Sequence, residues 1–339
     1  MPTANLSNPV SIQTTKPRHH AQAVRMISTN QMDHSLWLKY RNLGIGASDA
    51  ATACGLNPYK SQLELWMEKT GRIQPEQSDM REDSPLVWGT ILEPIVAEHY
   101  AKRTGRRVRR VNSILQHAEH RWMLANLDRE IVGDSEVQIL ECKTAGTYSA
   151  KHWENGVPEY IQLQVQHQLA VTGQMAADVA VLIGGQKLEI FRLERDDVLI
   201  EQLIKLEEAF WHRVENNIPP PADASQSASS ALRQLYQHDN TETIDLSEDS
   251  LANEQFEALL DVREQLTALQ DKEALLKNQL QQRIGENSVA VLANGKVSWK
   301  ESKPSMVLNT KRLKKEQTQL CNDYTTVRQG SRRFLLQPN

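Results

Sequence analysis

The apolar and polar positions between Asp33 and Pro221 alternate between a helical period and a strand period without a long polar gap. This pattern predicts one mixed α/β domain. Pro94 is expected in the first turn of one of its helices, where a proline is tolerated. The helices are predicted at residues 61–70, 92–103, 158–173 and 197–216. Short, antiparallel strands are predicted at 108–115, 122–128 and 137–143, and a β-hairpin at 177–183 and 188–193.

The segments on either side of this domain have a different pattern. Residues 1–32 are polar, contain three prolines and lack an apolar stretch, so they are expected to be a flexible arm and not a signal peptide. Residues 222–249 follow three consecutive prolines and include a serine-rich stretch, which predicts a linker. Residues 250–339 are expected to form a long amphipathic helix and a small β-like tail at 297–299 and 332–336.

The long helix, predicted at 250–284, has the spacing of a coiled coil. Its apolar residues follow one another at intervals of three and four, and the rhythm is broken only at Glu273. They are Leu259, Val262, Leu266, Leu269, Leu276 and Leu280. Such a face needs a partner surface.

Composition and charge narrow the class of protein. The 339 residues include 39 Lys and Arg against 43 Asp and Glu, for a net charge of −4, and no apolar run is long enough to span a membrane. The three cysteines form no CxxC pair, which argues against a disulfide framework and against a zinc or iron–sulfur site. A reducing cytoplasm is the expected compartment.

The strongest chemical signal is Asp128, followed by Glu141-Cys142-Lys143. Strand alternation places Glu141 and Lys143 on one face, where an Asp from a neighbouring strand can meet them. Two carboxylates and the backbone carbonyl of Cys142 suit Mg²⁺, and an adjacent ammonium suits hydrolysis of a phosphodiester. The alternative is that Glu141 and Lys143 form only a solvated ion pair on a sheet edge.

Further motifs occur around this cluster in a fixed order. They are Trp37-Leu38-x-x-Arg41-x-x-Gly44-Ile45-Gly46-Ala47-Ser48-Asp49-Ala50-Ala51, Trp88-Gly89-x-x-x-Glu93, Leu127-Asp128-Arg129, Glu141-Cys142-Lys143 and Gln164-Val165-Gln166. From Asp33 to Pro221 the chain therefore resembles the YqaJ-type viral recombinase family, which is similar to lambda exonuclease. The resemblance implies an α+β, PD-(D/E)XK restriction-endonuclease-like core with a central mixed sheet flanked by helices. Leu127 departs from the proline in the name of that fold.

The resemblance also implies roles for individual residues. Asp128 and Glu141 would be metal ligands, with Glu93 a further acidic group near the metal. Lys143 would be the catalytic lysine, and Gln166 would position the attacked phosphate or the water, supported by Gln164. The alternative for Glu93 is a capping box that begins at Thr90.

A phosphate site is the second expectation. The resemblance implies that Arg41 and Ser48 bind a DNA phosphate, and the turn from Gly44 to Ser48 is of the kind whose free N–H groups attract anions. The alternative is that Ser48 or Asp49 merely caps a helix.

A cluster of six cations lies between residues 102 and 110. Beside a phosphodiester site it is expected to contact the DNA backbone, whereas a charge run elsewhere is usually a solvated face. Its members are Lys102, Arg103, Arg106, Arg107, Arg109 and Arg110.

These features favour a DNA exonuclease that uses Mg²⁺, with Mn²⁺ as a substitute, and that resects duplex ends from 5′ to 3′. By resemblance, its expected partners are a single-strand-annealing recombinase and further copies of itself in a ring-like homo-oligomer. One alternative is an endonuclease on the same fold. The other is a non-catalytic DNA-binding adaptor that acts through its C-terminal helix.

Overall fold

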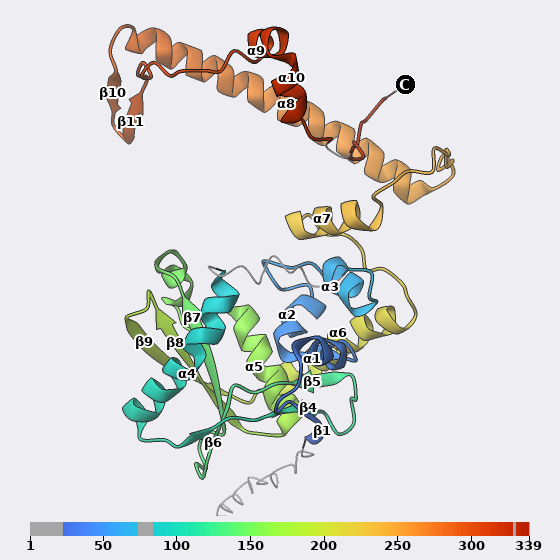
Figure 1. The fold of residues 1–339 in the computed structure, drawn as a ribbon, viewed down its shortest axis with the longest axis vertical. Helices are drawn as coiled ribbons and strands as arrows, with labels where there is room; N and C mark the ends of the chain where they lie inside the picture. The colour runs from blue at the N-terminus through green and yellow to red at the C-terminus, as the bar shows by residue number, and fades with distance from the viewer. Residues whose placement is uncertain (1–22, 74–83, 328–329, 339) are drawn as a thin grey trace, which may run out of the picture. The chain divides into compact units, whose positions relative to one another are not determined.

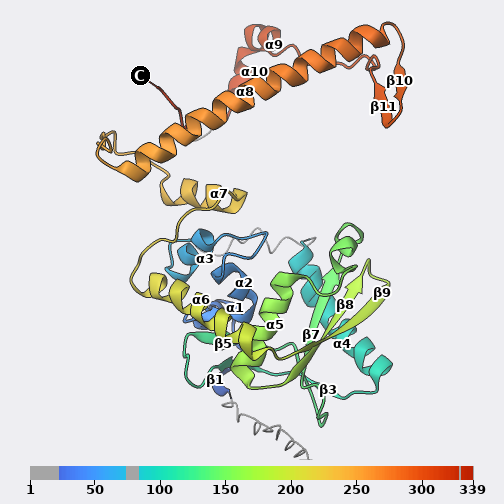
Figure 2. The ribbon, with the colours of Figure 1, turned by 180° about the vertical axis from the view of Figure 1, so that it is seen from behind.

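The computed structural model describes residues 23–73, 84–327 and 330–338, and Figures 1 and 2 show it from two opposite sides. Residues up to Leu235 form one compact unit, and those from Tyr236 onward form a second. Each unit is described separately below.

A five-stranded sheet is the centre of the first unit. Its strand order is β3-β6-β7-β8-β9, in which β7 and β8 are parallel and the other neighbours are antiparallel. The sheet is therefore mixed, as expected. The hairpin predicted from Gly184-Gly185 is confirmed as β8 and β9. The bounds are β3 Val108–Arg109, β6 Arg129–Ile131, β7 Ile139–Ala145, β8 Ala176–Ile183 and β9 Lys187–Glu194.

Helices cover both faces of this sheet. Ile139 and Val179 point to the face that packs against α5 Glu159–Thr172, whereas Leu140 and Ala180 point to the face covered by α4 Pro85–Thr104. Alternation along the buried strands produces these two cores. The mixed α/β class with a central sheet flanked by helices is thus confirmed.

The helices α3 Gln62–Lys69, α5 and α6 Asp197–Glu215 match their predicted positions. α4 differs from the helix predicted at 92–103, because it already begins at Pro85. The Ser84 hydroxyl caps this start by accepting a hydrogen bond from the Val87 N–H at 3.2 Å. Pro94 consequently lies in the interior of α4 and not in its first turn. Other helical segments of this unit include α1 His34–Arg41, η1 Ala47–Asp49, α2 Ala50–Ala53 and η3 Thr147–Trp153.

A smaller sheet of four strands corrects two expectations. Its order is β1-β4-β5-β2, with bounds β1 Val24–Ser28, β4 Ser113–Gln116, β5 Met123–Ala125 and β2 Ile45–Gly46. The strand predicted at 108–115 is in fact two strands, β3 and β4, which join different sheets. The flexible-arm expectation is wrong for residues 23–32, because β1 pairs with β4 there; residues 1–22 lie outside the described range.

The stretch expected to be a linker contains a packed helix, α7 Gln226–Leu235. Ala228 and Ala231 are buried, and α7 packs against α3. Ser227 accepts a hydrogen bond from the Ser61 backbone N–H at 2.8 Å and donates one to the Glu64 carboxylate. The linker prediction is therefore wrong for this helix, because small side chains allow a serine-rich segment to pack closely.

A chain ending after Leu235 should fold, and its midpoint of thermal unfolding should be close to that of the first unit within the full-length protein. A chain ending at Ala222 should be less stable by at least about 2 kcal/mol, since it loses the hydrogen bonds of Ser227 to Ser61 and Glu64, each worth about 1 kcal/mol, together with the buried alanines of α7. Denaturant unfolding of the two truncated proteins measures the difference. Equal free energies of unfolding would contradict the structural role of α7.

The second unit contains the predicted long helix, α8 Ser250–Ile284, and a hairpin of β10 Val289–Leu292 and β11 Gly295–Ser298. Two short helices follow, α9 Thr310–Glu316 and α10 Thr318–Asp323. Residues 332–336 form no strand, contrary to expectation. Within the described ranges, no helix combines the length and the apolar character needed to cross a membrane.

Candidate active site

Asp128 lies where the pairing between β6 and β7 ends. The last paired residues are Arg129 and Leu140, and beyond them Asp128 Oδ2 accepts a hydrogen bond from the Cys142 N–H at 2.8 Å. The carboxylate thus occupies the edge of β7 that β6 leaves open. Because the N–H and C=O of one strand residue point to the same side, the Cys142 carbonyl also faces this edge.

Glu141 and Lys143 lie on the same face of β7, as expected. Lys143 Nζ is 2.8 Å from Glu141 Oε1, and Glu141 is only 3% exposed. The Glu141 carboxylate is also enclosed by Gln164 and Gln168 of α5. The alternative of a solvated ion pair is therefore wrong, because protein groups and not bulk water surround the carboxylate.

Two glutamines of α5 hold this pair in position. Gln164 accepts a hydrogen bond from Lys143 Nζ at 3.0 Å and donates one to Glu141 Oε1 at 2.6 Å. Gln168 donates to Glu141 Oε2 at 2.7 Å. Gln164 and Gln168 are four residues apart and so share one face of the helix. Gln168 was missed by the sequence analysis, although this spacing was visible in the sequence.

Gln166 lies on a different face of α5, and its predicted role is wrong. Its amide donates to the Glu194 carbonyl at 2.7 Å and accepts from the Asp196 N–H at 3.0 Å. The first contact joins α5 to the end of β9 and the second joins it to Asp196, which caps α6. Gln166 therefore supports the fold. Gln164 occupies the position beside Glu141 and Lys143 that the sequence analysis assigned to Gln166.

Burial and neighbouring charges shift the pKa values of Asp128 and Lys143. Burial first, and then the neighbouring Glu141 carboxylate, raise the pKa of Asp128 to about 8. Burial opposes the charge on Lys143, but Glu141 and Asp128 outweigh it and hold the pKa of Lys143 above its usual value. At neutral pH Lys143 is thus an ammonium, which can donate hydrogen bonds and stabilise negative charge but cannot accept a proton.

The raised pKa predicts how metal-free protein responds to pH. An unfolded aspartate loses its proton near pH 4, whereas folded Asp128 keeps it until about pH 8. Between these values the folded state binds more protons, so the free energy of unfolding should fall as the pH rises. Thermal unfolding in EDTA from pH 5 to pH 8.5 measures this fall, and Asp128→Asn should reduce it. Identical pH profiles for both proteins would contradict the assignment.

The donor set at this edge fits a hard divalent cation. A carboxylate has about four lone-pair positions, and Glu141 uses three of them for Lys143, Gln164 and Gln168, which leaves one on Oε2. Asp128 and the Cys142 carbonyl supply further oxygens. Two buried carboxylates side by side repel each other, and a cation would relieve that repulsion. In the described parts of the chain, no group of three or more His, Cys, Asp and Glu residues is placed to hold a metal.

Glu93 belongs to α4. Its carboxylate pairs with the Arg129 guanidinium, and the same guanidinium donates a hydrogen bond to the backbone carbonyl of Asp128. Glu93 therefore positions the segment that carries Asp128. A direct role of Glu93 at a metal remains a prediction.

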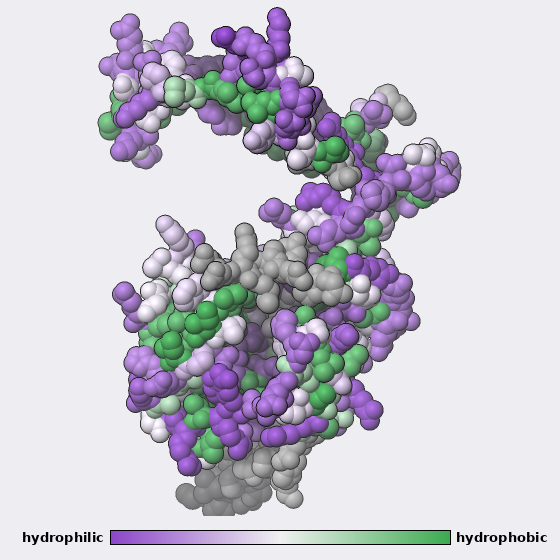
Figure 3. Space-filling view, in the orientation of Figure 1, coloured by the Kyte–Doolittle hydropathy of each residue, from purple (hydrophilic) through white to green (hydrophobic). Residues whose placement is uncertain are grey.

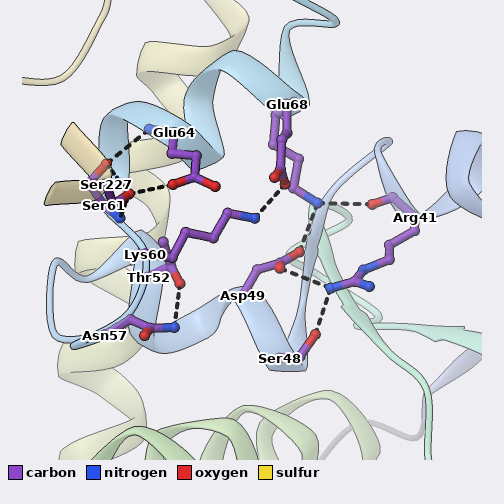
Figure 4. Close-up of polar contacts among 11 residues, drawn as sticks. Arg41, Ser48, Asp49, Thr52, Asn57, Lys60, Ser61, Glu64, Glu68 and Ser227 are labelled. Carbon is purple, nitrogen blue, oxygen red and sulfur yellow. Dashed lines mark hydrogen bonds and ion pairs between the residues drawn. The ribbon is translucent and has the colours of Figure 1, made fainter. Parts of the chain in front are cut away.

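Arg41, Ser48 and Asp49 form a second polar cluster, drawn in Figure 4. Arg41 Nη2 donates to Ser48 Oγ at 2.7 Å and to Asp49 Oδ1 at 2.9 Å, and Lys69 Nζ reaches Asp49 Oδ2 at 2.9 Å. Burial disfavours the charge on Asp49, yet Arg41 and Lys69 hold the pKa of Asp49 well below its usual range. Asp49 precedes α2 without a side-chain capping bond, so the capping alternative does not describe it.

Within the described structure, three of the six cations in the basic cluster at residues 102–110 pair with carboxylates. Arg106 pairs with Asp134 at 2.7 Å and lies 3.6 Å from Asp178, and Arg109 pairs with Glu130 at 2.7 Å. Lys102 pairs with Glu98, and Arg103 donates to the Leu188 carbonyl. Arg106 thus serves the fold. DNA contact by Lys102, Arg103, Arg107, Arg109 and Arg110 remains a prediction.

Comparison with known proteins places this arrangement in a family. Residues 36–175 match the YqaJ-like viral recombinase domain, a range that contains all five motifs of the sequence analysis. The chain is 37% identical over 294 residues to the uncharacterized protein YqaJ of Bacillus subtilis (strain 168), covering 85% of this chain and 90% of that protein. The chain belongs to the YqaJ family.

Solved structures similar to this YqaJ-family protein include an alkaline exonuclease (LHK-Exo) from Laribacter hongkongensis. It has 23% sequence identity and a TM-score of 0.46, over 54% of this chain and 94% of that chain. A phage-related exonuclease from Haemophilus somnus has 11% identity and a TM-score of 0.36, over 54% of this chain and 98% of that chain.

Proposed function

We propose that this YqaJ-family protein is a metal-dependent deoxyribonuclease of the PD-(D/E)XK type that degrades duplex DNA from its ends. The observation that carries the proposal is the buried cluster of Asp128, Glu141 and Lys143, held by Gln164 at the open edge of β7. A carboxylate pair with an adjacent ammonium is suited to a phosphodiester, because a metal ion held by the carboxylates and the ammonium itself can both stabilise the negative charge that develops on the phosphate during hydrolysis.

Asp128, Glu141 and the Cys142 carbonyl would hold Mg²⁺, or Mn²⁺ in its place. A bound divalent ion would supply a polarised phosphate and an activated water. Lys143 would donate to a phosphate oxygen and stabilise the charge that develops there, since its raised pKa keeps it protonated. Gln164 would keep the Lys143 ammonium oriented, and Gln168 would keep Glu141 from rotating.

Arg41 and Ser48 would bind the terminal phosphate of the DNA. Arg41 uses Nη2 for Ser48 and Asp49, so in the described structure its other N–H groups remain free for a ligand. The Trp37 ring lies under the Arg41 guanidinium, with the Arg41 Cζ atom 5.3 Å from the centre of the ring, and this contact holds the guanidinium in position. A 5′ phosphate bound in this way would favour degradation from 5′ to 3′.

A duplex with 5′ phosphates should accordingly be degraded about ten- to a hundredfold faster than a duplex with 5′ hydroxyls at subsaturating DNA. A charge-assisted contact contributes about 1.5–3 kcal/mol, which corresponds to this range. Arg41→Ala should remove most of the preference, whereas Arg72→Ala, a change of another arginine stacked on a tryptophan, should leave it intact. Equal initial rates of wild-type protein on both ends would exclude end recognition by Arg41.

The proposed function is tested with end-labelled linear duplex and closed circular duplex, each with Mg²⁺ and with EDTA. Progressive loss of nucleotides from linear DNA alone supports the exonuclease. Cleavage of the closed circle favours the endonuclease alternative, and binding without cleavage favours the adaptor. If the exonuclease function is supported, its single-stranded product would be the substrate for an annealing recombinase. Sedimentation of the protein with DNA would test the separate proposal of a ring-like homo-oligomer.

A further inference from the structure

The apolar face of α8 lacks a cover within the described residues of the second unit. Every residue from Asp261 to Gln279 is exposed, and apolar side chains are visible along the helix in Figure 3. Leu266, Leu269 and Leu276 are each more than half exposed. A stripe of this kind is unfavourable in water and marks an interface.

The stripe is complementary to itself. We propose that α8 pairs with α8 of a second copy of this chain as an antiparallel two-stranded coiled coil. The residues of the stripe occupy the two core positions of the heptad, with Ala252, Leu259, Leu266, Glu273 and Leu280 at the first and Gln255, Val262, Leu269, Leu276 and Arg283 at the second.

One register pairs every one of these residues with the opposite core position. With a two-fold axis next to Thr267 and Ala268, at the middle of α8, Leu266 faces the partner's Leu269 and Leu259 faces the partner's Leu276. In an antiparallel pair first core positions face second core positions, and this register satisfies that rule along the whole helix. The two helices then overlap from end to end.

Charge decides between the antiparallel and the parallel arrangement. A parallel pair would place Glu273 against the partner's Glu273 and Arg283 against the partner's Arg283, which buries like charges together. In the antiparallel register Glu273 faces the partner's Val262, next to the partner's Arg263. Lys277 Nζ of the same helix lies 3.0 Å from Glu273 Oε1, so this carboxylate also has an ion-pair partner within its own helix.

The two halves of α8 also carry opposite charge. The N-terminal half contains Glu254, Glu257, Asp261 and Glu264 against the single Arg263, whereas Lys272, Lys277 and Arg283 outnumber the acidic residues of the C-terminal half. An antiparallel pair places the acidic half of each helix beside the basic half of the other. It also places the positive N-terminal end of each helix dipole beside the negative C-terminal end of the partner's dipole.

Oligomeric state tests the proposal with the full chain, by light scattering over a range of concentrations. Wild-type protein should dimerise, and Leu269→Glu should raise the dimer dissociation constant at least about 100-fold. Asn278→Glu adds the same charge on the outer face of α8 and should change it little. Glu273→Leu should lower the dissociation constant about tenfold, because it makes every core position from Leu259 to Leu280 apolar.

Circular dichroism of each variant checks that α8 remains helical. The opposite effects of Leu269→Glu and Glu273→Leu keep the test decisive even if one variant folds poorly. A wild-type chain that stays monomeric would overturn the proposal and leave a heterologous partner for the stripe. A dimer or larger assembly insensitive to Leu269→Glu would also overturn it.

Disulfide cross-linking tests the direction of the pair. Leu259→Cys mixed with Leu276→Cys should form a dimer linked between these two positions, identified by mass spectrometry of the peptides. Either variant alone should not link to itself through the new cysteine, since copies of one position would lie about 25 Å apart, beyond the reach of a disulfide. A Leu259→Cys protein that links to itself at this position would overturn the antiparallel arrangement. The outcome does not depend on nuclease activity.

Discussion

Replacing Lys143 with alanine should reduce metal-dependent DNA cleavage by about 10²- to 10⁴-fold, the range observed when a positioned acid–base or charge-stabilising group is lost. Lys143 lies outside the apolar core, and without it the buried Glu141 carboxylate keeps its hydrogen bonds from Gln164 and Gln168, so folding should persist. Glu141→Gln keeps the shape of the side chain and removes its charge, and we expect a loss at least as large.

Single-turnover digestion of labelled duplex measures the loss, and equilibrium binding of the same duplex shows whether DNA is still held. Lys205→Ala is the matched control, because Lys205 pairs with Glu201 on the exposed side of α6. Rates like those of the wild type in purified Lys143→Ala or Glu141→Gln protein would remove these residues from the proposed site.

Replacing Asp49 with alanine should lower the free energy of unfolding by about 3–5 kcal/mol. Asp49 is the shared partner of Arg41 and Lys69, and the Lys69 side chain is only 2% exposed. Without the carboxylate, a buried ammonium keeps only the Arg41 carbonyl, 3.2 Å away, among its described partners. Leaving one buried charge without its counterion accounts for the expected cost.

Chemical denaturation of the Asp49→Ala protein measures this cost. Ser48→Ala is the matched control in the neighbouring position, and it should cost about 1 kcal/mol or less, since it removes one partly exposed hydrogen bond to Arg41. If both variants unfold at the same denaturant concentration, Asp49 does not hold the cluster together.

The sequence was informative where local chemistry decides structure. Glu141 and Lys143 share a face because alternation along a strand leaves no other choice, and capping by Ser61 fixes the start of α3. Tertiary contacts decided the rest. The split between β3 and β4 depends on which sheet each half meets, and apolar periodicity does not contain that information.

The glutamines of α5 show the same limit at the site. Gln164, Gln166 and Gln168 are chemically identical, and only the rotation of α5 about its axis determines which of them reach Glu141. Two residues two positions apart point in different directions from a helix, but this spacing does not determine which of Gln164 and Gln166 points toward β7. Likewise, the serine-rich composition of α7 did not indicate that two alanines pack it onto α3.

The position of α5 has a consequence for how the protein loses activity. Every residue from Val165 to Thr172 is buried, so the backbone amides of this helix can exchange with solvent only when the whole domain opens. Gln168, which holds the Glu141 carboxylate, is attached to this slowest-exchanging segment, and Gln164 immediately precedes it. Heat inactivation should therefore coincide with global unfolding, with no folded but misaligned species preceding it.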